Sequence, residues 1–187
     1  MCRSHGVSVQ FRALTAIAAS VCASLALTPP AMADDGDLFI ISPAEDGSLL
    51  AIGAGAYNVL QNKRAAELRL EYRSALHFLY VIEPVAGALV TNRGTLYGYG
   101  GLRIDVMFGE HVVLTPSAAI GLWRPGSGKE LGSTVEFKTG AELAWRFADA
   151  SRLGISFDHI SNAGLTKHNP GVESLLLVYS LPLGWTY

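Results

Sequence analysis

The chain has 187 residues, half of them hydrophobic, with 14 basic and 16 acidic side chains. The formal net charge of −2 excludes the strongly basic surface of a nucleic-acid-binding protein. The length suits a single domain. Beyond residue 33 no run of about 18 apolar residues occurs, which excludes a membrane-spanning helix there, although the chain is rich in hydrophobic residues and glycine.

Residues 1–33 predict a secretory signal peptide. Arg3 and Arg12 give a positively charged start, and an apolar run follows. The small-x-small pattern Ala31-Met32-Ala33 places cleavage before Asp34. An uncleaved membrane anchor is the alternative, but the apolar run is short for it and a cleavage pattern follows.

Both cysteines, Cys2 and Cys22, lie inside this segment. A lipoprotein signal at Cys22 is disfavoured because Val21 precedes it, where such a signal needs a very small residue. The exported part then has no cysteine and can form no disulfide.

Residues 34–187 predict an all-β domain, with 34–48 as a loose lead-in. The cleanest pattern lies at 133–147, where apolar and charged side chains occupy alternate positions. A strand sends successive side chains to opposite faces, so one face is apolar and the other charged. We expect eight strands, at residues 49–60, 66–75, 79–90, 95–108, 111–123, 133–147, 151–162 and 173–183.

Alternation fits two kinds of barrel. A soluble lipid-binding barrel of the periplasm points its apolar side inward, whereas a membrane barrel has an apolar exterior and a polar lumen. The strands are near or above the ~9–11 residues that a tilted strand needs to cross a bilayer. Charges of both signs on the polar parity can pair across a narrow lumen. We therefore predict an eight-stranded antiparallel up-and-down transmembrane β-barrel.

The end of the chain supports the membrane barrel. An apolar parity runs through the last strand to Trp185 and Tyr187, which resembles the C-terminal assembly signal of bacterial outer-membrane barrels. This resemblance implies the barrel-assembly machinery as a partner during insertion. Short turns near 74–77, 109–110 and 148–150 alternate with longer loops, and an even strand count puts both termini in the periplasm. Pro84 and Pro116 are expected at bulges or edges of regular pairing.

Three polar residues break the apolar parity of the last two strands. His159 and Ser161 come late on the seventh strand, in register with apolar residues, and Glu173 opens the eighth. If the apolar parity faces lipid, all three face the outer leaflet near its headgroups, where a polar group costs roughly 0–1 kcal/mol.

Serine, histidine and glutamate together can perform acyl transfer. A histidine base activates the serine hydroxyl, and a carboxylate orients the imidazole. Ser161 is the expected nucleophile, His159 the base and Glu173 the orienting acid, with the amide of Asn162 and the N–H of Gly164 as oxyanion donors. The alternative is that the polar residues of 161–171 are ordinary turn residues with an interfacial histidine.

The pattern His159-x-Ser161-Asn162-Ala163, followed by Asn169-Pro170-Gly171-x-Glu173, resembles the outer-membrane lipid A 3-O-deacylases of the PagL type. That family consists of eight-stranded outer-membrane barrels with a Ser-His-Glu triad on the outer surface. The resemblance implies a serine esterase that removes the ester-linked 3-hydroxyacyl chain from the 3-position of lipid A, with lipopolysaccharide as substrate. Phe157, Leu175 and Leu177 would contact acyl chains.

Other readings remain open. A small structural or adhesion-type outer-membrane barrel without catalysis is the main alternative, and in it the polar trio would be dispensable. His168 lies beside Lys167 in an expected exposed turn and is disfavoured as the base. Too few histidine, cysteine or acidic residues cluster to suggest zinc, and the resemblance implies no metal and no organic cofactor. The sequence allows a homodimer without requiring one.

Overall fold

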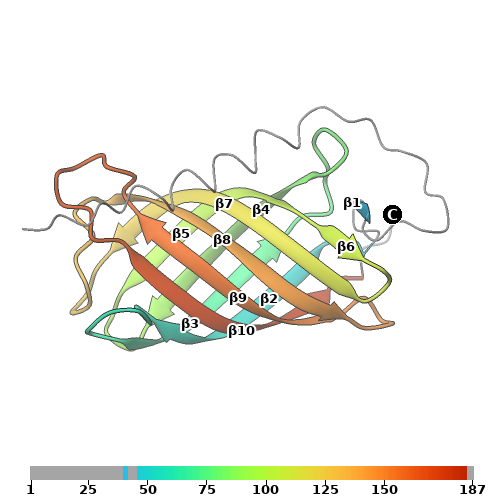
Figure 1. Cartoon of the computed structure of the whole chain (residues 1–187), viewed down its shortest axis with the longest axis horizontal. Coiled ribbons are helices and arrows are strands. Elements are labelled where there is room, and N and C mark those ends of the chain that lie inside the picture. Colours follow the sequence, from blue (N-terminus) through green and yellow to red (C-terminus); the bar gives the residue numbers. More distant parts are fainter. Residues whose placement is uncertain (1–39, 42–45, 185–187) are drawn as a thin grey trace, which may run out of the picture. The chain divides into compact units, whose positions relative to one another are not determined.

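The computed structural model describes residues 40–41 and 46–184, shown in Figure 1. The predicted signal peptide, its cleavage site, most of the lead-in and the residues at 185–187 lie outside this range. Among the described residues, no helix has the length and hydrophobicity to span a membrane. The described fold consists of ten strands: β1 (Ile40–Ile41), β2 (Leu49–Tyr57), β3 (Ala65–Arg73), β4 (Ile82–Thr91), β5 (Leu96–Ile104), β6 (Val106–Phe108), β7 (Val112–Arg124), β8 (Val135–Arg146), β9 (Arg152–Ser161) and β10 (Val172–Pro182).

These strands form a closed antiparallel barrel with eight positions around its wall. We call each position a stave; seven are occupied by one strand each, and one is occupied by β5 and β6 in line. From β2 to β5 and from β7 to β10 each strand pairs with the next along the chain, β5 pairs with β7, and the pairing of β10 with β2 closes the ring. β6 continues the stave of β5, and the two-residue β1 pairs with β6. The predicted fold class is confirmed, and each predicted strand corresponds to one stave.

One predicted strand is interrupted. The stretch predicted at 95–108 is divided at Asp105 into β5 and β6, and both halves keep the same register against β7. The gap lies opposite Thr115 and Pro116, and a proline has no N–H to donate to the ladder. Thr115 Oγ1 donates instead to the Asp105 carboxylate at 2.7 Å. Pro116 thus lies at an interruption on the β5 side, as expected, but keeps its pairing with Ala141 on β8, and Pro84 lies just beyond the last residue pair of β3 and β4.

The barrel is apolar outside and charged inside. On β3, Leu68 and Leu70 are 59% and 52% exposed, whereas Glu67 and Arg69 are 1% and 5% exposed. A soluble barrel would reverse this arrangement, so the alternative of a soluble lipid-binding barrel is wrong. The burial pattern is that of a transmembrane barrel.

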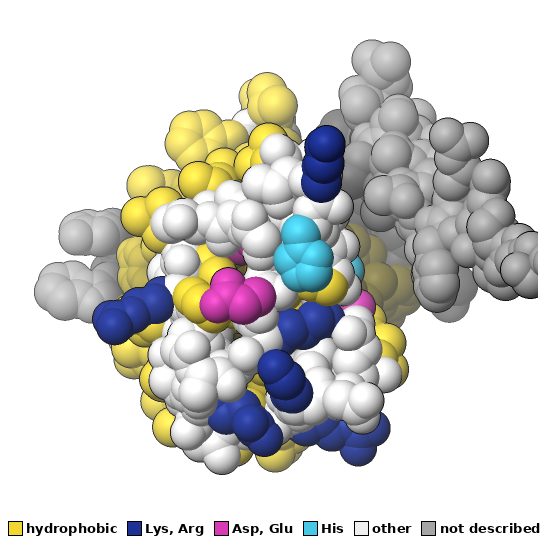
Figure 2. All heavy atoms as spheres, turned by 90° about the vertical axis from the view of Figure 1, so that its left-hand side faces the viewer, with side chains coloured by type: hydrophobic (Ala, Val, Ile, Leu, Met, Phe, Trp, Pro, Cys, Tyr) yellow, Lys and Arg dark blue, Asp and Glu magenta, His cyan; other side chains and the backbone are white. Residues whose placement is uncertain are grey.

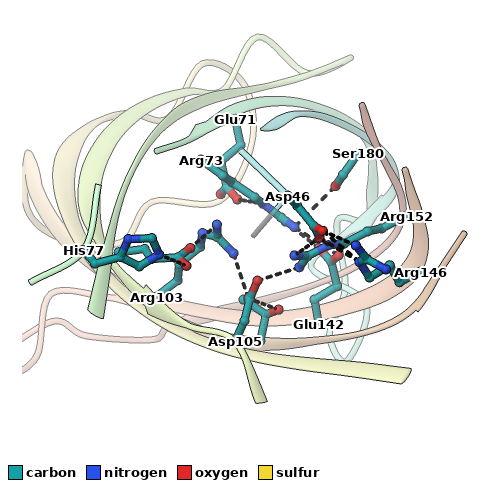
Figure 3. Close-up of polar contacts among 12 residues, drawn as sticks. Asp46, Glu71, Arg73, His77, Arg103, Asp105, Glu142, Arg146, Arg152 and Ser180 are labelled. Atoms are coloured by element: carbon teal, nitrogen blue, oxygen red, sulfur yellow. Dashed lines mark hydrogen bonds and ion pairs between the residues drawn. The ribbon is translucent and has the colours of Figure 1, made fainter. Parts of the chain in front are cut away.

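Ion pairs fill much of the lumen, as predicted from the mixed charges of the polar parity (Figure 3). Arg73 on β3 pairs with Glu142 on β8, and Arg152 on β9 pairs with Asp105 and Asp46. Arg69, Lys138 and Asp158 form a second group. Lys138 and Asp158 join the neighbouring strands β8 and β9, whereas Arg73–Glu142 and Arg69–Asp158 cross the lumen between strands that are not paired. All of these contacts compensate charges that burial would otherwise make costly.

An apolar cluster inside the barrel was not predicted. Its buried members are Tyr57, Ala65, Leu89, Tyr97, Tyr99, Ala119, Trp123, Leu131, Ile160 and Val172. The rings of Tyr57 and Trp123 stack with centroids 5.9 Å apart. Ile160 and Val172 are paired across β9 and β10, so the cluster supports the inner face of the last hairpin.

The two ends of the barrel differ (Figure 1). We call loop end the one that carries the connections 58–64, 92–95, 125–134 and 162–171, and turn end the other. The connections 109–111 and 147–151 at the turn end are short, as predicted. The third connection of the turn end is longer than predicted. The strand predicted to begin at residue 79 begins at Ile82, so this connection spans 74–81 and is closed by a bridge between Phe78 and Ile82.

Candidate active site

β9 and β10 place the three predicted polar residues on the outer wall. His159 lies directly opposite Glu173 in the antiparallel register, where Cβ atoms are about 4.5–5.5 Å apart. The lumen-facing neighbours Asp158 and Ser174 are each 1% exposed. The predicted outward facing of this parity is therefore confirmed, and Asp158 faces away from the site.

His159 and Glu173 are in contact. Nδ1 of His159 lies 3.1 Å from Oε1 of Glu173, and the two side chains are 44% and 15% exposed. An ionised carboxylate only accepts hydrogen bonds, so this contact places the ring proton on Nδ1. Nε2 is then the nitrogen that can accept a proton from a substrate or a nucleophile.

Gly171 supports the imidazole. Its φ is +58°, and a Cβ at this position would lie 2.6 Å from Cε1 of His159. Such a separation is shorter than any carbon–carbon van der Waals contact, so only glycine lets the loop approach the ring this closely. Gly171 belongs to the motif found in the sequence, but this role could not be predicted there, because the positive φ and the close approach to the ring appear only in three dimensions.

Ser161 lies on the same face as His159, at the last position of β9. It is half-exposed, and its backbone pairs with Phe137 on β8. Residues i and i+2 of a strand are about 6.5–7 Å apart at Cα. The structure brings His159 and Glu173 together and sets Ser161 one step further toward the loop. No hydrogen bond between Ser161 and His159 is found among the described residues.

Asn162 holds the 162–171 loop, which differs from the predicted role in an oxyanion hole. Its side chain is buried, and Nδ2 lies 2.9 Å from three acceptors, the carbonyl oxygens of Leu131 and His168 and the hydroxyl of Thr166. The N–H of Gly164 donates to Asn162 Oδ1 at 2.9 Å. Both predicted oxyanion donors are thus engaged within the loops, and an anion bound there would have to displace these partners.

Lys129, from the 125–134 loop, reaches the base of the same hairpin. Its Nζ donates to the carbonyl oxygens of Gly171 and Pro170, the latter at 3.3 Å, and to Oε1 of Gln61 at 2.5 Å. Partial burial lowers the pKa of this ammonium group, and the nearby Glu173 carboxylate opposes that shift. Lys129 therefore links three loops beside the site, a role that no sequence motif indicated.

The wall beside the trio is apolar. Phe157 and Leu175 face each other across β9 and β10 and are 45% and 46% exposed, and Leu177 is 58% exposed. These side chains run from the polar trio toward the middle of the barrel on the lipid-facing surface. His168, the disfavoured alternative base, lies exposed on the loop, where its carbonyl oxygen accepts from Asn162.

Comparison with known proteins shows a similarity to one family. Residues 105–182 match the model of a family described as lipid A 3-O-deacylase (PagL). Over this segment, which is less than half of the chain, the protein is similar to that family. Among curated proteins it is similar to the lipid A deacylase PagL of Pseudomonas aeruginosa, 36% identical over 55 residues, and to that of Bordetella bronchiseptica, 33% identical over 52 residues.

These sequence matches cover 29% and 28% of this chain, and 32% and 29% of the two PagL proteins, so the chain spans about a third of the curated relatives it matches. The likeness in fold is wider. The crystal structure of the outer membrane enzyme PagL superposes with a TM-score of 0.60 at 20% identity, over 72% of this chain and 99% of that one. A designed transmembrane β-barrel superposes with a TM-score of 0.51 at 9% identity, over 71% and 92%. The described fold is thus that of outer-membrane barrels.

Proposed function

We propose that the protein is a lipid A 3-O-deacylase that works as a serine esterase in the outer leaflet. The observation that carries the proposal is the outward contact of His159 with Glu173 on the lipid-facing wall, with Ser161 on the same face. A soluble esterase would bring its substrate into a cleft, whereas this pair lies on a wall whose other side chains suit acyl chains. The similarity to proteins named lipid A deacylase PagL supports the choice of substrate.

The first step forms an acyl-enzyme. Nε2 of His159 takes the proton of the Ser161 hydroxyl as Oγ attacks the ester carbonyl. Glu173, bonded to Nδ1, holds the ring in the productive tautomer and stabilises the imidazolium that forms. The tetrahedral intermediate collapses, the bond to the sugar oxygen breaks, and the imidazolium returns its proton to that oxygen.

The second step releases the fatty acid. His159 takes a proton from water, which attacks the acyl-serine carbonyl, and the proton then returns to Ser161 as the 3-hydroxy fatty acid leaves. The attack requires Ser161 and His159 to come within hydrogen-bond reach, about 2.6–3.2 Å, when substrate is bound. Such bonds often tighten only in the enzyme–substrate complex.

The position of the site suits a substrate that stays in the membrane. The proposal places the loop end at the outer surface, so that the trio lies at headgroup depth and the acyl chains lie along Phe157, Leu175 and Leu177. A polar site at that depth costs roughly 0–1 kcal/mol in a barrel wall. The enzyme can then bind a lipid laterally without removing it from the bilayer.

Lipid A mass spectrometry tests this function. The chain is expressed in a bacterium with fully acylated lipid A, and the lipid A spectrum is recorded. We expect loss of one hydroxyacyl group with the wild-type chain, and an unchanged spectrum with Ser161→Ala or His159→Ala, since loss of a triad nucleophile or base lowers kcat by about 10⁶-fold.

Matched control residues are present on the 125–134 and 162–171 loops beside the site. Ser127→Ala and His168→Ala remove an exposed serine and an exposed histidine, and we expect both to leave deacylation intact. An unchanged spectrum from a wild-type barrel that is inserted and heat-modifiable would refute the function and favour a structural barrel.

A further inference from the structure

The loop end of the barrel contains a polar hollow beside the candidate site. Its volume is about 920 Å³, and it lies between the 58–64 loop and the 125–134 loop. The lining residues are Leu60, Gln61, Asn62, Lys63, Arg64 and Lys129. Half of them are cationic, and none is acidic.

Positive charge is concentrated at this end. The four connections of the loop end carry Lys63, Arg64, Arg93, Lys129 and Lys167 against Glu130. The described connections of the turn end carry Glu110 and Asp149 and contain no lysine or arginine. Figure 2 looks onto the loop end and shows Lys and Arg side chains gathered over it. This asymmetry gives the loop end an attraction for anions that the other end lacks.

The hollow is joined to the candidate site by direct hydrogen bonds. Lys129 Nζ bonds both Gln61, in the hollow, and the carbonyl oxygen of Gly171, two residues before Glu173. The N–H of Val59 donates to the carbonyl oxygen of Glu173 at 3.0 Å. The hollow therefore adjoins the start of β10, which carries Glu173 of the candidate site.

Two of the cations have side chains open to a ligand. Lys63 and Arg64 are exposed, and within the described part of the chain no hydrogen bond or ion pair engages the ammonium of Lys63 or the guanidinium of Arg64. Arg64 is anchored through its backbone instead, because its carbonyl oxygen accepts from Arg93 Nε at 3.1 Å. A planar guanidinium binds a phosphate in bidentate fashion, and an ammonium adds a point charge.

We propose that this hollow binds a phosphate group of the substrate's sugar headgroup through Lys63 and Arg64 while the ester is held at Ser161. The inference rests on the proposed function and adds a second recognition element to it. The bound phosphate fixes the sugar relative to the trio, so the site selects phosphorylated lipid over lipid that lacks phosphate.

The test uses the full chain refolded in detergent and two substrates, lipid A with its phosphates and the same lipid with them removed. Lys63→Asn and Arg64→Gln are combined. Asparagine suits the positive φ of 68° at Lys63, so the pair removes charge without adding strain. We expect KM for phosphorylated lipid A to rise about three- to tenfold and kcat to stay unchanged, because two exposed contacts are lost. KM for phosphate-free lipid should not change.

Arg124→Gln is the matched control, since it removes an exposed cation of the same end outside the hollow. An equal rise in KM with Arg124→Gln, or an equal effect on both lipids, would overturn the proposal. Inorganic phosphate is added as a competitor, because the hollow could bind either a phosphate of the lipid headgroup or free phosphate. Weak competition supports the headgroup phosphate, and binding of inorganic phosphate as tight as that of the lipid would overturn the proposal.

A binding measurement keeps the two proposals separable. The dissociation constant of each lipid is measured on a Ser161→Ala background, with and without the paired substitutions. Weaker binding of phosphorylated lipid alone supports the phosphate site even if the wild-type chain deacylates nothing. Unchanged binding with intact deacylation overturns the phosphate site and leaves the esterase standing.

Discussion

At the scale of single residues, the side of the barrel wall that a side chain faces decides its role, even for residues that are adjacent in the sequence. Asp158 and His159 are adjacent, yet Asp158 bonds Arg69 and Lys138 in the lumen whereas His159 bonds Glu173 on the outer wall. A strand has a period of two, so the side of each residue follows once one neighbour is assigned. This is why the outward direction of the trio could be predicted, whereas the period alone does not set the distance between the Ser161 and His159 side chains.

Gly171→Ala tests how tightly the imidazole is held. The added Cβ would meet His159 Cε1 at 2.6 Å and turn the ring. A displacement of about 1 Å can cost about 100-fold in rate, so we expect kcat to fall by that order with little change in KM. The measurement is steady-state deacylation by the refolded enzyme.

Gly109→Ala is the control for this substitution. Gly109 also has a positive φ, +64°, but a Cβ there meets nothing within 4 Å. It adds comparable backbone strain far from the site, and we expect kcat to stay at the wild-type value. Similar losses in both variants would show that strain alone explains the effect and that Gly171 does not position the ring.

At the scale of elements, strands were predictable and their connections were less so. β3 and β8 alternate cleanly, and their bounds differ from the prediction by one or two residues. The 74–81 connection was predicted too short because Leu79 and Tyr80 extend the apolar pattern, yet both have positive φ and cannot continue a strand. Lys129 was missed because it bonds a residue 42 positions away, a contact that no local pattern contains.

Lys129→Met tests whether this lysine holds the 162–171 loop. Methionine keeps most of the length and removes the donors to Gly171, Pro170 and Gln61. Hydrogen bonds from a charged donor contribute about 1.5–3 kcal/mol, so the open state of the loop should become at least tenfold more populated. We expect trypsin to cleave after Lys167 about tenfold faster, measured on the folded barrel.

Arg124→Gln serves again as the comparison, because it removes an exposed cation of the same end without touching the loop contacts. Cleavage after Lys167 should then proceed at the wild-type rate. If trypsin cleaves after Lys167 at the same rate in the Lys129→Met barrel as in the wild-type barrel, the Asn162 contacts hold the loop without Lys129.

At the scale of the whole molecule, the barrel reverses the usual sorting of side chains. Charged residues fill the lumen and leucines cover the wall, so an apolar surface and a polar interior are each compatible with their surroundings. The predicted parity gave this arrangement correctly, but it did not reveal the apolar cluster near the loop end. Tyr57, Tyr97 and Trp123 occur on the lumen parity, and an aromatic ring on a barrel strand suits either face.

Asp158→Asn tests the contribution of the lumen charges to stability. The carboxylate of Asp158 pairs with Arg69 at 2.6 Å and with Lys138 at 2.8 Å, and it is almost fully buried. Removing one partner of a buried ion pair costs about 3–5 kcal/mol, because the remaining charges lose their compensation. We therefore expect the free energy of unfolding, measured by urea titration of the barrel in lipid vesicles, to fall by about that amount. Glu110→Gln makes the same change of charge at an exposed turn and should change the free energy of unfolding by less than about 0.5 kcal/mol.

Because Asp158 faces away from His159, the folded fraction of Asp158→Asn should deacylate lipid A at the wild-type rate. A folded but inactive variant would contradict the separation of the two faces.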